Sequence, residues 1–156
     1  MLQTHQPEIV TLDPHPVALV REIVRMDALP PFFGRAFGAV ARAAGLQGVP
    51  LAGPPIAVYF GMPTETVDVG AGFPTVGGVT PDADVASLTL PGGRAAQVLH
   101  EGAYDEMGVT YGRLMEWFAE QALTPAPMMW ESYLNDPDPA APEEAKTLIV
   151  WPIAER

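Results

Sequence analysis

Two stretches of the chain carry the same spacing of apolar side chains, and this repetition restricts the folds that the chain can adopt. Apolar residues separated by 4, 3 and 4 positions fall on one face of a helix. The two sets, displaced from each other by 74 positions, are Phe33, Phe37, Val40 and Ala44, and Met107, Tyr111, Leu114 and Phe118. We therefore expect two amphipathic helices at corresponding places of a duplicated fold.

Short apolar segments bounded by proline and glycine flank both helices and predict strands. A turn is expected at residues 13–16, and the glycines at 70–72 are expected to end a strand. The predicted strands are 8–12, 17–25, 56–60, 64–69, 87–90, 94–100, 128–134 and 147–153. This order predicts an α+β fold, a duplicated strand-strand-helix-strand repeat with an antiparallel sheet, two helices and a central ligand groove.

The expected domain organisation is one domain over residues 1–156, with pseudo-repeats at about 8–72 and 87–153. The element order supports the repeat, but residue identities do not fix its register. A shift of one helical turn aligns the two helices nearly as well and pairs Gly45 with Ala122. Proline is tolerated in the first turn of a helix, so Pro30 predicts where the first helix starts, and Gly45 predicts where it stops.

The charge balance is strongly acidic, with 8 Lys and Arg against 19 Asp and Glu and a formal net charge of −11. Such a field repels phosphate backbones and anionic membranes and favours cations, so we expect no direct nucleic-acid binding and no membrane partner. The chain has no cysteine, no membrane-length apolar run and no signal-peptide pattern, which predicts a cytoplasmic protein. The histidines show no metal-ligand spacing, and we expect neither a metal nor a cofactor.

The predicted strand 128–134 is almost entirely apolar and contains one carboxylate, Glu131. Because side chains alternate along a strand, Met129, Glu131 and Tyr133 share a face. Burying a carboxylate costs several kcal/mol, or forces the group to stay protonated, unless a charged or hydrogen-bonding partner compensates for it. One interpretation is a structural ion pair with an arginine such as Arg94 or Arg113, and the other is a charge partner for a cationic ligand.

Four segments follow one another in the second half of the chain: LPGGR at 90–94, HEGAYDE at 100–106, WESYLNDP at 130–137 and VWPI at 150–153. In this order and at these distances they resemble the GyrI-like family, which includes the effector-binding domains of MerR- and AraC-type multidrug-responsive activators. The resemblance implies a groove for drug-like, often lipophilic and cationic compounds. It also implies that Glu131 contacts the ligand. The other side chains expected to bind the ligand are Tyr133, Tyr104, Trp151, Tyr59 and Met129.

The chain begins almost at its first predicted strand, so we expect a stand-alone binder that senses or sequesters small, cationic or amphipathic molecules. A second hypothesis is a cofactor-free hydrolase of strained, cyclopropane-type natural products, with Glu131 as acid or base. Tyr133 or His100 would supply the complementary proton, although His100 more simply bonds local backbone. A third hypothesis from the resemblance is a gyrase-inhibitor-like protein inhibitor. The sequence leaves open whether the chain forms a homodimer or binds another protein.

Overall fold

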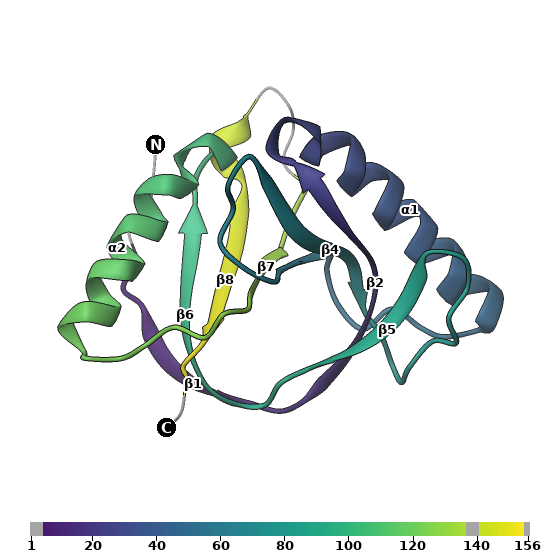
Figure 1. Ribbon diagram of the computed structural model, residues 1–156, viewed down its shortest axis with the longest axis horizontal. Coiled ribbons are helices and arrows are strands. Elements are labelled where there is room, and N and C mark those ends of the chain that lie inside the picture. Colours follow the sequence, from purple (N-terminus) through teal and green to yellow (C-terminus); the bar gives the residue numbers. More distant parts are fainter. Residues whose placement is uncertain (1–4, 137–140, 155–156) are drawn as a thin grey trace. The chain divides into compact units, whose positions relative to one another are not determined.

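The structure is a computed structural model, and it describes residues 5–136 and 141–154. Two strands precede and two follow each long helix, so the predicted α+β fold with antiparallel strands and two helices is confirmed (Figure 1). The elements are β1 (Glu8–Leu12), β2 (His15–Arg25), α1 (Leu29–Gln47), β3 (Ile56–Tyr59), β4 (Thr66–Pro74), β5 (Val85–Leu90), β6 (Gly93–Glu101), α2 (Met107–Glu120), β7 (Met129–Tyr133) and β8 (Lys146–Pro152), with 3₁₀ helices at Met26–Ala28, Tyr104–Glu106 and Pro142–Glu144.

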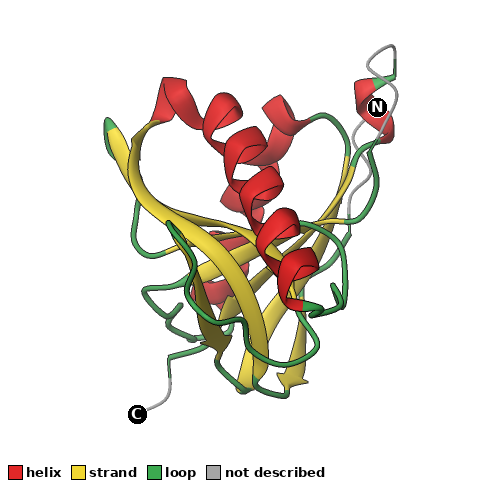
Figure 2. Ribbon diagram, turned by 90° about the vertical axis from the view of Figure 1, so that its right-hand side faces the viewer, coloured by secondary structure: helices red, strands yellow, loops and turns green. Residues whose placement is uncertain are grey.

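The chain divides into two compact units. Unit 1 comprises Met1–Leu12 and Gly93–Arg156, and unit 2 comprises Asp13–Gly92. The strand order in unit 1 is β1-β6-β8-β7, and α2 packs on these strands. The strand order in unit 2 is β3-β4-β2-β5, and α1 packs mainly on β2 and β4. All of these pairs are antiparallel, and the strands are curved and twisted (Figure 2).

Each predicted repeat contributes its first strand to the unit that contains the helix of the other repeat. β1 pairs with β6, and β5 pairs with β2. The predicted turn at residues 13–16 is therefore wrong, because β2 already begins at His15, which pairs with Leu90. Residues 13 and 14 connect strands of different units instead of closing a hairpin. The repeat boundaries at 8–72 and 87–153 describe element order along the chain and stay a prediction.

Strand pairing inside each unit shows which residues of the two units correspond. The row Glu22, Val69, Tyr59 across β2, β4 and β3 corresponds to the row His100, Thr147, Tyr133 across β6, β8 and β7. The displacement is 78 positions for the first two pairs of strands and 74 for β3 and β7. The helices follow the displacement of 78, since each of the three buried side chains of α2 has a buried counterpart in α1. These pairs are Phe32 and Thr110, Ala36 and Leu114, and Val40 and Phe118.

The first helix departs from prediction at its end and on its face. Gly45 does not stop it; α1 continues to Gln47, and Gly48, at φ 68°, ends it with its N–H directed to the carbonyls of the last turn. The prolines do lie in its first turn. The expected stripe through Phe33 and Phe37 is only half-buried, because the buried row runs through Phe32.

The glycines at 70–72 do not end a strand, since β4 runs through them to Pro74. A Cβ on Gly72 would lie 1.9 Å from the carbonyl oxygen of Ala18, and one on Gly70 would lie 2.8 Å from the Leu19 side chain. Glycine is required at residue 72 because the backbone of β2 approaches β4 closely there, and not because the chain turns. Within the described ranges, no helix is long and apolar enough to cross a membrane.

Candidate functional site

Glu131 is the centre of β7 and faces α2. β7 pairs with β8, so Glu131 lies opposite Ile149 and Tyr133 lies opposite Thr147. The predicted alternation holds, because Tyr111 of α2 contacts both Met129 and Glu131. The carboxyl group is buried, with 7% of the residue exposed. A strand of apolar neighbours thus holds one acid on the face that the helix covers.

Two tyrosine hydroxyl groups donate hydrogen bonds to the Glu131 carboxylate. Tyr133 donates a hydrogen bond to Oε1 at 2.7 Å, and Tyr111 donates a hydrogen bond to Oε2. Tyr111 also lies 3.8 Å from the Met129 sulfur. These hydrogen-bond donors on Glu131 are tyrosines and not the guanidinium of Arg94 or Arg113, so neutral groups stabilise the acid within its unit.

Burial raises the pKa of Glu131 above its ordinary value of 4.5. The hydrogen bonds from Tyr111 and Tyr133, and the nearby His100, each lower the pKa but do not cancel the effect of burial. The arrangement therefore holds a carboxyl group that takes up a proton more readily than a surface glutamate. A bound cation would favour its ionised form.

Aromatic rings surround the two phenols. Tyr104, 51% exposed, meets Tyr133 edge-on with ring centroids 6.1 Å apart. Desolvation raises the pKa of Tyr104, and the charges of Asp136 and Glu131 raise it further. Trp151 meets Tyr111 edge-on at 6.3 Å. Its indole N–H donates to the carbonyl of Ala126 at 2.7 Å, so Trp151 is a fixed, buried wall.

A second polar side chain, His100 of β6, lies on the same face of the sheet, in one row with Thr147 and Tyr133. His100 is fully buried; its Nε2–H donates to the carbonyl of Ala103 at 2.9 Å, and its Nδ1 shares a hydrogen bond of 2.6 Å with the Thr110 hydroxyl. The predicted bonding of His100 to local backbone is confirmed. Thr147, between His100 and Tyr133 in the sheet, is also fully buried.

Four of the five other predicted ligand-binding residues gather at Glu131 in unit 1, namely Tyr133, Tyr104, Trp151 and Met129. Tyr59 lies in β3 of unit 2, opposite Val69, and is half-buried. Tyr111 also belongs to the site but is not among the predicted site residues, because its place on the apolar stripe of the helix indicates only packing. A tyrosine on the apolar stripe of a helix needs a hydrogen-bond partner when buried, and that requirement was the available signal.

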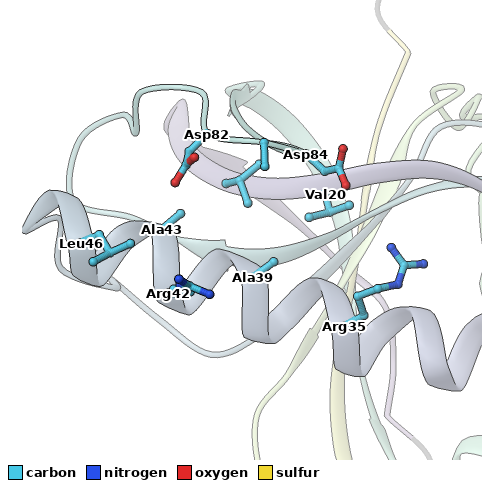
Figure 3. A pocket seen from close by; sticks show the side chains of 10 residues that line it. Val20, Arg35, Ala39, Arg42, Ala43, Leu46, Asp82 and Asp84 are labelled. Carbon is cyan, nitrogen blue, oxygen red and sulfur yellow. The ribbon is translucent and has the colours of Figure 1, made fainter.

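Unit 2 contains a different concavity, a cavity of about 520 Å³ between α1 and the residues around 82–85 (Figure 3). Its floor is aliphatic and its rim carries Arg35, Arg42, Asp82 and Asp84. Arg35 is held by Glu22 through two hydrogen bonds of 2.8 and 3.1 Å. This cavity has no aromatic lining. Across the described ranges, no group of three His, Cys, Asp or Glu side chains is placed to hold a metal ion.

The sequence profile of the GyrI-like small molecule binding domain matches residues 5–154. The chain belongs to the GyrI-like family. Its arrangement of strands and helices agrees with this assignment. Comparison with curated protein sequences gives no significant match.

Solved structures share the fold of this GyrI-like chain. EcmrR in a DNA complex is 20% identical, with a TM-score of 0.80, covering 97% of this chain and 58% of that one. The separate C-terminal domain of EcmrR is 18% identical, with a TM-score of 0.77 and coverage of 97% and 98%. SAV2435 bound to tetraphenylphosphonium is 14% identical, at 0.66 and coverage of 96% and 94%. A hydrolase from Listeria innocua is 16% identical, at 0.63 and coverage of 96% and 92%.

Proposed function

We propose that this GyrI-like protein binds small lipophilic organic cations, with Glu131 as the charge partner, and so senses or sequesters them. The observation that carries the proposal is the buried Glu131 carboxyl, which two phenols hold in place. A buried acid without a cationic partner costs free energy, and proteins keep such groups where they act. A bound cation would supply the missing charge.

The aromatic surroundings fit the same class of ligand. Cations are attracted to the faces of tyrosine and tryptophan rings, by about 2 kcal/mol or more when water is excluded. Tyr104 is half-exposed and stacks edge-on against Tyr133, which itself bonds Glu131. Both carboxylate oxygens already accept a hydrogen bond, so a ligand without N–H groups loses little here. Quaternary or delocalised cations therefore fit this carboxylate best.

The family and one neighbour point in the same direction. The matched family binds small molecules, and SAV2435 binds tetraphenylphosphonium, a lipophilic cation. This chain spans 58% of the EcmrR chain that binds DNA. A role in regulating transcription therefore belongs to the proposal as one use of ligand binding.

The test is calorimetric titration with tetraphenylphosphonium and with neutral triphenylphosphine oxide. We expect the wild type to bind the cation more tightly than the neutral compound. Glu131→Gln should weaken cation binding by roughly 1.5 to 3 kcal/mol, about 10- to 150-fold, and leave the neutral compound unchanged. Glu116→Gln, which removes an exposed charge from α2, is the matched control. Equal binding of both compounds to all three proteins would contradict the proposal.

Hydrolysis is the second candidate, because the same carboxyl group has a raised pKa and contacts two phenols. A general acid or base benefits from a pKa closer to neutrality. The Listeria innocua hydrolase has this fold. Product formation from a cyclopropane-containing alkylating agent that disappears in both Glu131→Gln and Tyr133→Phe would favour this candidate. The protein-inhibitor hypothesis stays a prediction from the resemblance alone.

A further inference from the structure

One buried polar atom beside Glu131 has no hydrogen-bond partner. It is the hydroxyl oxygen of Thr147, in β8. The neighbouring polar groups on this face are satisfied: His100 bonds Thr110 and the Ala103 carbonyl, and Glu131 accepts from two phenols. An unsatisfied buried hydroxyl costs free energy, so it requires an explanation.

The pairing of the strands fixes where this hydroxyl lies. Thr147 is opposite His100 of β6 on one side and Tyr133 of β7 on the other. Glu131 is the diagonal neighbour, at a Cα separation of about 7 to 8 Å, and shares the face. A single water can span the remaining gap. Three groups can bind it, since the Tyr133 oxygen and the Glu131 carboxylate each retain lone pairs.

Unit 2 shows that the fold does not need a hydroxyl at this position. The residue that corresponds to Thr147 is Val69, which is equally buried between Glu22 and Tyr59. Valine has nearly the shape of threonine, so packing is served without the oxygen. Unit 2 also has Ala57 where unit 1 has Glu131. The hydroxyl and the carboxylate are thus present together in one unit and absent together from the other.

We infer that the Thr147 hydroxyl holds a buried water that hydrogen-bonds the Glu131 carboxylate, which makes Thr147 a positioning residue of the site. The water donates to the carboxylate and stabilises its ionised form. Its effect on cation affinity rests on the proposed function, whereas its effect on Glu131 itself does not. Groups from every other part of unit 1 that faces the carboxylate also act on it: Tyr133 of β7, Tyr111 of α2, His100 of β6 and Tyr104 of the preceding 3₁₀ helix.

The first test is a ¹³C NMR titration of the Glu131 side-chain carboxyl in the free protein, assigned by comparison with Glu131→Gln. Thr147→Val should move the midpoint upward by about one pH unit, since a hydrogen bond to a charged group is lost. Thr147→Ser, which keeps the hydroxyl, should restore the wild-type midpoint. An unchanged midpoint in Thr147→Val would overturn the inference. Because no ligand is needed, this outcome is independent of whether cations bind.

The second test uses the wild type alone and so does not depend on how the variants fold. A bound water should give a nuclear Overhauser effect between water and the Thr147 methyl protons. Its absence would count against the water. Urea unfolding separates the alternatives further. If the hydroxyl is simply unsatisfied, Thr147→Val will be more stable than the wild type with the same Glu131 titration, and the inference fails.

If tetraphenylphosphonium binds, its affinity provides a third readout. Protons compete with the cation for Glu131, so affinity falls as the pH decreases through the pKa of the carboxyl group. In Thr147→Val this decline should begin at a pH about one unit higher, while the affinity at alkaline pH stays within about twofold of the wild type. An equal loss of affinity at every pH would identify Thr147 as a packing residue and overturn the inference.

Discussion

Position for position, Glu131 and Thr147 of unit 1 correspond to Ala57 and Val69 of unit 2, and Tyr111 corresponds to Phe33. Strand pairing and helix packing are alike in the two units, although these side chains differ in polarity. The framework is therefore stable with apolar residues at each place. The Glu131 carboxyl group and the Tyr111 hydroxyl are therefore additions to the fold, whereas Tyr133 has a tyrosine, Tyr59, as its counterpart.

The two units also respond differently to protons. In unit 2 the pKa values of Asp68 and Glu22 are lowered, mainly by hydrogen bonds from Arg21 and Arg35 at the surface. In unit 1 burial raises the pKa of Glu131. The surface pairs favour the folded state when they are ionised. The buried acid favours it when it is protonated.

The largest expected effect concerns close packing, which differs between the units at Gly72 and its counterpart Val150. Gly72→Ala should destabilise the protein by about 4 kcal/mol or more, because the new Cβ would overlap the Ala18 carbonyl. Gly38→Ala on α1, where a Cβ meets nothing, should stabilise by up to about 1 kcal/mol. Urea unfolding measures both. A mild effect of Gly72→Ala would show that β2 can move away from β4.

The next effect comes from moving the acid into unit 2. Ala57→Glu should destabilise by roughly 3 to 5 kcal/mol near neutral pH, because Phe33 offers no hydroxyl where unit 1 has Tyr111. Adding Phe33→Tyr should recover about 1 to 3 kcal/mol. Ala41→Glu, on the exposed face of α1, is the control and should change stability by less than about 0.5 kcal/mol. If Ala57→Glu alone is harmless, the Tyr111 hydroxyl is not what makes the acid tolerable in unit 1.

A smaller effect is the pH dependence that Glu131 confers. The folded state keeps its proton to a higher pH than the unfolded state, whose value is near 4.5. The contribution of Glu131 to stability therefore decreases as pH rises from the unfolded pKa through the raised folded pKa. Glu131→Gln should gain stability relative to the wild type over this range. Urea unfolding of both proteins between about pH 5 and pH 8 measures the difference, and a difference that is constant with pH would refute the raised pKa.

The smallest expected effect is at the surface pair of unit 2. Arg21 donates two hydrogen bonds to Asp68, at 2.9 and 2.8 Å, and lies 3.7 Å from the centre of the Phe60 ring. Asp68→Asn should cost only about 0.2 to 1 kcal/mol, because both partners are partly exposed. The loss should vanish in acid, because the stability from the lowered pKa of Asp68 is fully present above the unfolded pKa and disappears as the pH falls through the folded pKa. A loss that persists in acid would point to packing of Arg21 on Phe60.

Much of the site followed from local pattern. Alternation along one strand placed Met129, Glu131 and Tyr133 on a common face, and the helix covers that face. Helical spacing identified Tyr111 as a side chain that points inward, but spacing cannot name a hydrogen-bond acceptor on another element. The glycines at 70–72 were misread for the same reason, since their cause is the neighbouring strand β2.

By itself, the sequence determined the order of strands and helices, the acidic charge and the alternation that turns Glu131 toward apolar neighbours. These properties depend on residues that are close along the chain. Only the tertiary structure decided that β1 pairs with β6, that Tyr111 reaches Glu131, and that Thr147 lies buried beside His100 without a partner. Those contacts join residues far apart in sequence, and their geometry is set by strand register and helix packing.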